Sequence, residues 1–218
     1  MTRRIIMTGI LSIVASGLAG GCRSDGTGAA NSAPTEDAIV SEAAGRVAEL
    51  NHGYALFLQV LKDQARVSQV LAVKSASPGL RALLKRISAS AQAQVDEIEQ
   101  MLALPPALAP ANTALPSIEV AARDRIEEDQ TATILTSGGD AFAFEVLLSQ
   151  ARATAYASAL ATSLKNRDTN ARRRETCKAI AGDWNMLGET VRSQLRALGS
   201  SPEAQKAPRP VVPGTPSP

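Results

Sequence analysis

Apolar residues recur at alternating intervals of three and four along most of this chain, which is the spacing of side chains on one face of an α-helix. Short runs rich in proline, glycine and serine interrupt this pattern. The pattern predicts five helices, which span residues 37–74, 78–102, 117–136, 141–165 and 170–198. We therefore expect an all-α protein in which each helix buries one face.

The predicted apolar faces differ in strength. The first helix has a heptad-like face made by Val40, Val47, Leu50, Tyr54, Phe57, Leu61 and Leu71. The last helix has the most regular face, made by Cys177, Ile180, Trp184, Leu187, Val191, Leu195 and Leu198. The third helix is more acidic and its apolar face is thin. The third helix is therefore the weaker prediction, with Ile118, Ala122, Ile126 and Ile134 as its apolar face.

The interruptions predict how the helices connect. Ser77 can cap the second helix and Pro78 stops the first, so these two helices should form an antiparallel hairpin. Four prolines in residues 104–116 predict an extended crossover that can traverse a bundle. Asp140 is the expected N-cap of the fourth helix. The predicted architecture is an antiparallel four-helix bundle with a proline-rich crossover and an extra short helix.

The chain begins with a charged and then apolar segment ahead of a cysteine. Arg3 and Arg4 precede an apolar run over residues 5–18, and small residues fill positions 19–21 before Cys22. This order is typical of a bacterial export signal, and the run is shorter than the ~20 apolar residues of a membrane-spanning helix. The segment resembles the lipobox of bacterial lipoproteins, although its leucine lies at position 18 instead of the usual position 19. The resemblance implies that Cys22 is lipidated and anchors the mature chain in a membrane.

Two alternatives to lipidation remain open, namely an ordinary cleaved secretory signal and, because of the paired arginines, twin-arginine export. The expected division is an export signal over residues 1–21, a flexible tether over 22–36, the helical bundle over 37–198 and a proline-rich disordered tail over 199–218. Such a chain is expected on the periplasmic side of the cell envelope. Arg23 and Ser24 stand where an aspartate often signals inner-membrane retention, which favours the outer membrane.

Charge is nearly balanced along the chain. There are 23 lysines and arginines and 21 aspartates and glutamates, and loss of Arg3 and Arg4 with the signal makes these counts equal. Nucleic-acid binding requires a basic surface, so this balance argues against a nucleic-acid partner. Aromatic residues make up only 3% of the chain, which favours helices over sheets.

Two helix beginnings resemble those of a known family. The second helix opens with SPGLRALL at residues 77–84, and SGGDAF at residues 137–142 opens the fourth. Over residues 43–198 the chain resembles the bacterial exported ferritin-like helical proteins of unknown function. The resemblance implies a ferritin-like bundle.

The histidines of that family are missing from this chain. The family carries an Asp-His pair in the second helix and one histidine in each of the last two helices. The matching positions hold Ser90 and Ala91, a residue near Thr154, and Asn185 or Met186. A metal or acid–base role of those histidines is therefore not implied for this protein.

The only histidine, His52, follows Glu49 at the spacing that di-iron bundles use to place two ligands on one helix face. A rotation of 100° per residue places His52 nearly opposite the core and Glu49 well off it. Glu145 and Glu189 lie opposite their own apolar faces by the same rotation. We therefore expect no metal, no cofactor and no enzymatic activity, because no base, nucleophile or carboxylate pair is brought together.

Basic residues gather around the turn between the last two helices. They are Lys165, Arg167, Arg172, Arg173, Arg174 and Lys178. Such a cluster can contact anionic lipid headgroups or a cell-wall polymer. The alternative is a solvated helix start in which these residues pair with Glu175.

Polar residues also occur on or near the apolar faces, at Gln64, Gln94, Gln150 and Thr154. They either line a polar pocket or form hydrogen-bonded pairs between helices. Core positions are expected for Phe142, Phe144, Cys177 and Trp184, with Cys177 acting as a small buried side chain.

The sequence as a whole predicts a lipid-anchored, non-catalytic bundle that acts as a binding or interaction module of the cell envelope. Its partners would be the membrane, through the lipid, and an unknown envelope protein or polymer. The alternative is a ferritin-like protein that binds a metal or small ligand in its core. A third possibility is a structural spacer within the envelope.

Overall fold

The computed structural model describes residues 36–113 and 115–200, which form helices and contain no β-strand. The prediction of an all-α protein is confirmed. The elements are α1 (Glu36–Ala65), the 3₁₀ helix η1 (Val67–Ala72), α2 (Pro78–Leu102), α3 (Ser117–Thr136), α4 (Gly139–Arg167) and α5 (Ala171–Gly199).

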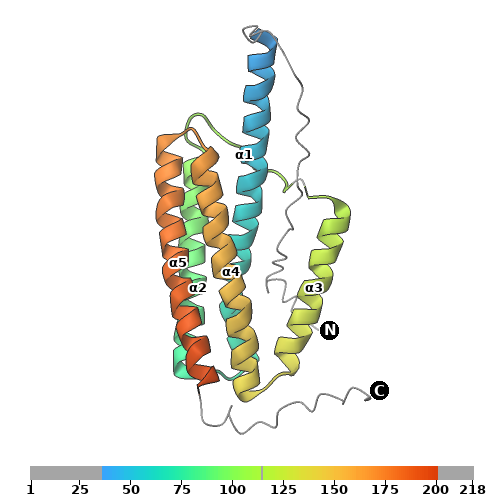
Figure 1. Cartoon of the computed structure of the whole chain (residues 1–218), viewed down its shortest axis with the longest axis vertical. Coiled ribbons are helices and arrows are strands. Elements are labelled where there is room, and N and C mark those ends of the chain that lie inside the picture. The colour runs from blue at the N-terminus through green and yellow to red at the C-terminus, as the bar shows by residue number, and fades with distance from the viewer. Residues whose placement is uncertain (1–35, 114, 201–218) are drawn as a thin grey trace, which may run out of the picture.

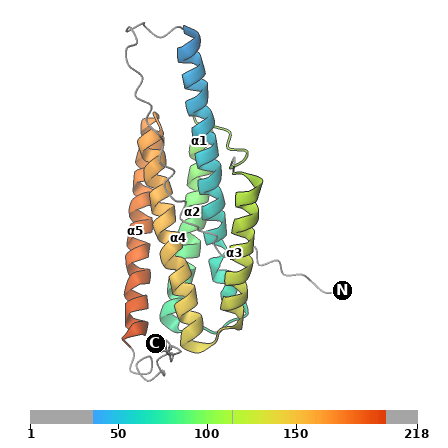
Figure 2. The same ribbon diagram turned by 45° about the vertical axis from the view of Figure 1, so that its right-hand side comes forward.

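Four long helices lie side by side, and α3 stands to one side of them (Figures 1 and 2). α1 contacts α2 and α4, and α5 contacts α2 and α4, so these four helices close around a common core. The α1–α2 and α4–α5 pairs are each antiparallel (Figure 1). α3 contacts the rest of the molecule mainly through α4.

The core combines large side chains on three helices with small ones on α4. Tyr54 and Phe57 of α1, Ile87 of α2 and Trp184 of α5 are fully buried. α4 contributes several buried alanines, namely Ala153, Ala157 and Ala161. Small residues on α4 allow α5 to approach closely, and a Cβ built on Gly188 would lie only 3.0 Å from the Thr154 Oγ1. Each large side chain buried here contributes about 1.5–3 kcal/mol.

The first predicted helix is wrong in two respects. It was expected to continue to residue 74, but α1 ends at Ala65 and a 3₁₀ helix follows. In a 3₁₀ helix residues i and i+3 are eclipsed, which places both Val67 and Val70 in the core. Val47 is 48% exposed, because the first turns of α1 stand beyond the ends of α4 and α5 (Figure 1).

The crossover also differs from the prediction. Residues 103–113 do not traverse the bundle. They fold over its end, where Leu108 is buried and the Ala109 N–H donates to the Asn51 side chain at 2.9 Å. The return along the bundle is made by α3 (Figure 1). The crossover therefore consists of a proline-rich segment followed by a helix.

Helix ends follow local chemistry, with one exception. The Ser77 hydroxyl accepts a hydrogen bond from the Leu80 N–H at 3.3 Å, which confirms the predicted cap of α2. α4 begins one residue before Asp140, and Gly138 is its N-cap, so the predicted Asp140 cap is wrong. Gly139 has a positive φ of 53°, a conformation that glycine adopts without strain.

The prediction that Phe144 lies in the core is wrong, because its side chain is 46% exposed.

Several predictions concern residues outside the described part of the chain. The export signal, Cys22, the tether up to residue 35 and the tail from residue 201 all lie there. Within residues 36–113 and 115–200, no helix combines the length and the apolar character needed to cross a membrane.

Candidate functional site

α3 is held to the molecule by few buried side chains. Of its residues only Ile134 is buried, whereas Ile118, Val120 and Leu135 are exposed, Ile118 by 81%. A helix gains most of its stability in a protein from packing of an apolar face, and α3 has little of this. Clefts consequently run along both sides of α3.

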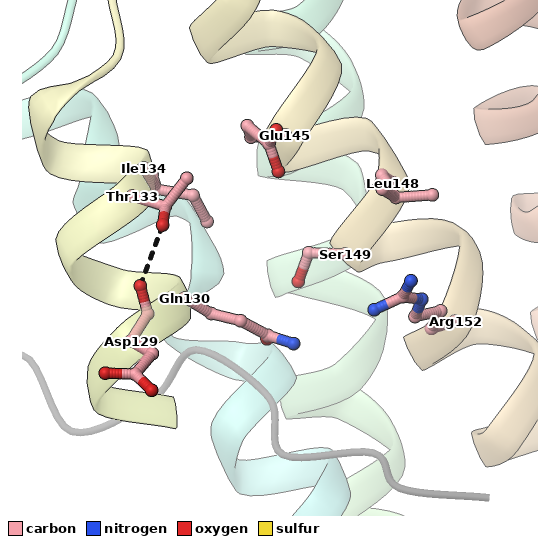
Figure 3. A pocket seen from close by; sticks show the side chains of 8 residues that line it. All are labelled: Asp129, Gln130, Thr133, Ile134, Glu145, Leu148, Ser149 and Arg152. Carbon is pink, nitrogen blue, oxygen red and sulfur yellow. Dashed lines mark hydrogen bonds between the residues drawn. The ribbon is translucent and has the colours of Figure 1, made fainter. Parts of the chain in front are cut away.

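The cleft between α3 and α4 has a volume of about 170 Å³. Figure 3 shows the side chains that line it, which are Asp129, Gln130, Thr133 and Ile134 of α3 and Glu145, Leu148, Ser149 and Arg152 of α4. The Thr133 hydroxyl donates to the Asp129 carbonyl at 2.9 Å, so it is already satisfied within its own helix. The Ser149 hydroxyl, the Gln130 amide and the Arg152 guanidinium point into the space between the helices (Figure 3).

Three residues of α4 build one wall of this α3–α4 cleft. Glu145, Ser149 and Arg152 follow one another at intervals of four and three, which places them on a single stripe of the helix. Glu145 was predicted to lie opposite the core, but its side chain is half-buried because α3 stands against this side of α4. The spacing places the three residues on one stripe, but only the position of α3 makes that stripe the wall of a cleft.

A second cleft, of about 200 Å³, lies between α1 and α3. It is lined by Leu56, Gln59, Val60, Asp63, Thr113, Leu115, Val120, Arg123, Asp124 and Glu127. Burial and the nearby charge of Glu127 raise the pKa of Asp63 to about 6, against the opposing effect of Arg66. Ionised Asp63 is thus unfavourable beside α3.

The polar residues on the apolar faces have different surroundings. Gln94 accepts a hydrogen bond from the Trp184 indole N–H at 2.7 Å, and this pair joins α2 to α5. The Thr154 hydroxyl donates to the Gln150 carbonyl of its own helix at 2.9 Å. The buried side chain of Gln64, the Ser149 hydroxyl and the Gln150 Oε1 have no hydrogen-bond partner among the described residues. Of the two interpretations, pairing between helices therefore applies to Gln94.

A small internal space adjoins the α3–α4 cleft. Its lining includes Ser149, Gln150 and Ile134, and its volume is about 10 Å³. A water molecule needs roughly 10–15 Å³ on this scale, together with polar partners. The space is at the lower limit of this range and the surface exposed to it is apolar, so it is not suited to a water that would satisfy Ser149 or Gln150.

A buried ion pair joins several segments at the end of the bundle where α4 turns into α5. Arg173 donates to Asp168 through Nε at 2.6 Å and through Nη2 at 2.9 Å. Tyr54 of α1 donates to the same carboxylate at 2.8 Å, and Arg173 Nη1 donates to the Pro106 carbonyl at 2.8 Å. Burial opposes ionisation of Asp168, but the hydrogen bonds from Arg173, the Asn170 N–H and Tyr54 outweigh it and hold the pKa of Asp168 below its usual range. This cluster is suited to fixing the turn and the crossover.

Cys177 lies beside this ion pair. Its side chain is fully buried, as expected, and its sulfur is 3.5 Å from the Tyr54 hydroxyl. Burial raises the pKa of the Cys177 thiol to about 11, and it also raises the pKa of Tyr54. A thiol in these surroundings is protonated at neutral pH and unreactive.

The predicted basic cluster is divided by the structure. Arg173 is only 2% exposed and belongs to the buried ion pair, so its place in a surface cluster is a wrong prediction. Arg167 pairs with Glu49, and Lys178 lies 3.5 Å from Glu175. Lys165, Arg172 and Arg174 form no ion pair with any residue of the described ranges; Arg172 and Arg174 are exposed and Lys165 is half-buried.

The residues considered above as metal ligands do not lie together in the structure. His52 is half-buried, not fully turned to solvent as predicted, and Glu49 is exposed. Within the described ranges, no group of three or more histidine, cysteine, aspartate or glutamate side chains is placed to hold a metal ion. Glu189 is exposed and pairs with Arg192 at 2.8 Å.

Comparisons with known proteins do not identify a relative. Searches of protein-family models, of curated proteins and of solved structures return no match to this chain. Of the positions matched to the family histidines, Ala91 and Thr154 are buried, whereas Asn185 and Met186 are exposed. The ferritin-like resemblance stays a prediction.

Proposed function

We propose that this protein is a lipid-anchored, non-catalytic binding module of the bacterial cell envelope, which binds its partner at the clefts beside α3. The observation that carries the proposal is that α3 buries a single side chain and is flanked by a cleft on each side. A helix packed in this way can adjust its position when a ligand enters at low energetic cost. The partner is an envelope protein or polymer, or a fragment of one.

The proposed anchor is a lipid on Cys22. Its support is the lipobox-like segment up to Cys22 and the way α1 leads away from the domain, with residues 41–49 exposed beyond the other helices (Figure 1). Residues 22–35, if extended, reach about 48 Å. Arg172 and Arg174 lie at the same end of the bundle and are available for anionic headgroups or polymers. We place the anchor on the periplasmic side, in the outer membrane.

We further propose that α1, α2, α4 and α5 constitute an antiparallel four-helix bundle of ferritin-like type, with α3 as part of its crossover. Two antiparallel pairs joined by one long connection support this assignment. The assignment concerns the fold and does not bring a metal site with it.

Anchoring and binding are tested separately. Mass spectrometry of the mature N-terminus should show diacylglycerol on Cys22, and Cys22→Ser should release the protein from membranes; an unmodified N-terminus would refute the anchor. For binding, a photo-crosslinking amino acid is placed at Thr133 or Asp124, which line the two clefts, and at Met186 of α5 as a control. Intact-mass spectrometry should find adducts from the cleft positions in living cells, and adducts that are absent or no more frequent than at Met186 would refute the binding face.

A further inference from the structure

Opposite charges stand at the two ends of the α3–α4 cleft. Glu145 and Arg152 are seven residues apart on α4, which separates their Cα atoms by about 10 Å along the helix. Neither forms an ion pair or side-chain hydrogen bond with another described residue, whereas Asp129 of the same cleft lies 3.6 Å from Arg125. A carboxylate and a guanidinium are therefore both available to a ligand that spans the cleft.

The Arg152 end of the cleft is rich in hydrogen-bond donors. The Arg152 guanidinium and the Gln130 amide nitrogen point toward one another across the cleft, and the Ser149 hydroxyl lies beside them (Figure 3). Donors that converge from two helices suit a carboxylate, which accepts several hydrogen bonds and pairs well with arginine. This end is therefore a carboxylate site.

Ser149 supplies independent evidence that the cleft takes a polar ligand. Thr133, Thr154 and Thr190 donate to the carbonyl four residues earlier in their helices, at 2.9–3.0 Å. The Ser149 hydroxyl is buried, makes no such bond and points into the cleft. A buried hydroxyl without a partner is unfavourable, so a ligand oxygen placed here would satisfy it.

The dimensions of the cleft restrict the size of the ligand. A cavity of about 150 Å³ holds benzene, so a cleft of about 170 Å³ takes up roughly seven heavy atoms, and the other atoms of a longer ligand lie at its open mouth. Two residues of extended peptide span about 7 Å, which is long enough to reach both charged side chains, while the two charges of a free amino acid lie too close together. Ile134 and Leu148 provide an apolar surface for short aliphatic side chains.

We propose that the α3–α4 cleft binds a small zwitterionic dipeptide, with its carboxylate at Arg152, Gln130 and Ser149 and its ammonium group at Glu145. The proposal rests on the proposed binding function and names the ligand class for one of its two clefts.

Isothermal titration calorimetry on the purified full chain tests the proposal with alanylalanine as the probe. Its N-acetylated form, its C-terminal amide and free alanine serve as comparison ligands. The free dipeptide should bind, and blocking either end should weaken binding by at least 10-fold. Glu145→Gln should weaken binding of the dipeptide but not of its N-acetylated form. Arg152→Gln should weaken binding of the dipeptide but not of its C-terminal amide.

Glu97→Gln and Arg86→Gln, both at exposed positions on α2, are the matched controls and should bind like the unaltered chain. Circular dichroism should show unchanged helix content in all four variants. Equal affinity for free and blocked peptides, or no binding of any, would overturn the proposal. If crosslinks from Thr133 persist in that case, only the ligand class is wrong; if they are also absent, the binding function falls with it.

Discussion

Asp168 and Arg173 form a two-point ion pair that is buried almost completely at the turn between α4 and α5. Through Tyr54 and the Pro106 carbonyl this pair also reaches α1 and the crossover. Three segments that are distant in the sequence, α1, the crossover and the α4–α5 turn, therefore meet at this ion pair. Loss of Arg173 would leave a buried carboxylate unpaired.

The first prediction concerns that arginine. Arg173→Met should lower the free energy of unfolding by about 3–5 kcal/mol, because breaking a buried pair leaves an uncompensated charge. Arg174→Met, an exposed neighbour, should change it by less than about 0.5 kcal/mol. Urea unfolding monitored by circular dichroism measures both, and a cost no larger for Arg173→Met than for Arg174→Met would contradict a structural role for the pair.

The second prediction concerns pH and the α1–α3 cleft. The pKa of Asp63 rises from 3.8 to about 6 on folding, so the folded chain keeps this proton at a pH where the unfolded chain has lost it. Stability should therefore fall as pH rises from about 4 to 6, by up to about 3 kcal/mol. Asp63→Asn should remove this loss.

The matched control for Asp63→Asn is Glu128→Gln, an exposed position on α3. Urea unfolding should show that Asp63→Asn raises the free energy of unfolding more at pH 7.5 than at pH 4.0, and more than Glu128→Gln does. A gain that is the same at both pH values would show that ionisation of Asp63 does not oppose packing of α3.

The third prediction concerns the attachment of α3. Ile134 is 3% exposed and is the one side chain that α3 buries, so Ile134→Ala should cost about 2–4 kcal/mol. Hydrogen exchange should become faster across residues 117–136 before it does so in α5. Ile118→Ala, at the exposed start of the same helix, should leave exchange unchanged. Equal effects of the two replacements would show that burial of Ile134 does not hold α3 in place.

The fourth prediction compares two buried serines of α4. Ser158 donates to the Ala181 carbonyl of α5 at 3.1 Å, whereas the Ser149 hydroxyl has no partner among the described residues. Ser158→Ala should cost about 1 kcal/mol, and Ser149→Ala should be neutral or stabilising, because it removes an unsatisfied group. Thermal unfolding in ligand-free buffer distinguishes them, and a loss at Ser149 as large as at Ser158 would mean that its hydroxyl is already satisfied.

The sequence could predict helices whose ends are marked by local chemistry. α2 starts after Ser77 and α3 spans residues 117–136 as expected. The exposure of Val47 could not be predicted, because it depends on where the neighbouring helices end in space. The change to a 3₁₀ helix after Ala65 has no proline or glycine to mark it and depends on burial of Val67 and Val70.

The candidate site was less predictable than the fold. Arg173 lies four residues before Cys177 and seven before Ile180, so it stands on the apolar face of α5. Because arginine is charged, the sequence pattern assigned it to the surface instead of to the core. Glu145 and Arg152 lie on the side of α4 away from that helix's apolar face, and only the position of α3 turns this side into a cleft. Such a cleft is a property of how helices pack, and a single helix pattern does not contain it.

The most direct test of the binding account is crosslinking from Thr133 in living cells, read by intact-mass spectrometry. The account predicts a defined adduct on the otherwise unaltered chain and its loss when Glu145→Gln and Arg152→Gln are introduced together, with Glu97→Gln and Arg86→Gln leaving it intact. An adduct that survives the first pair, or that forms equally from Met186, would contradict it.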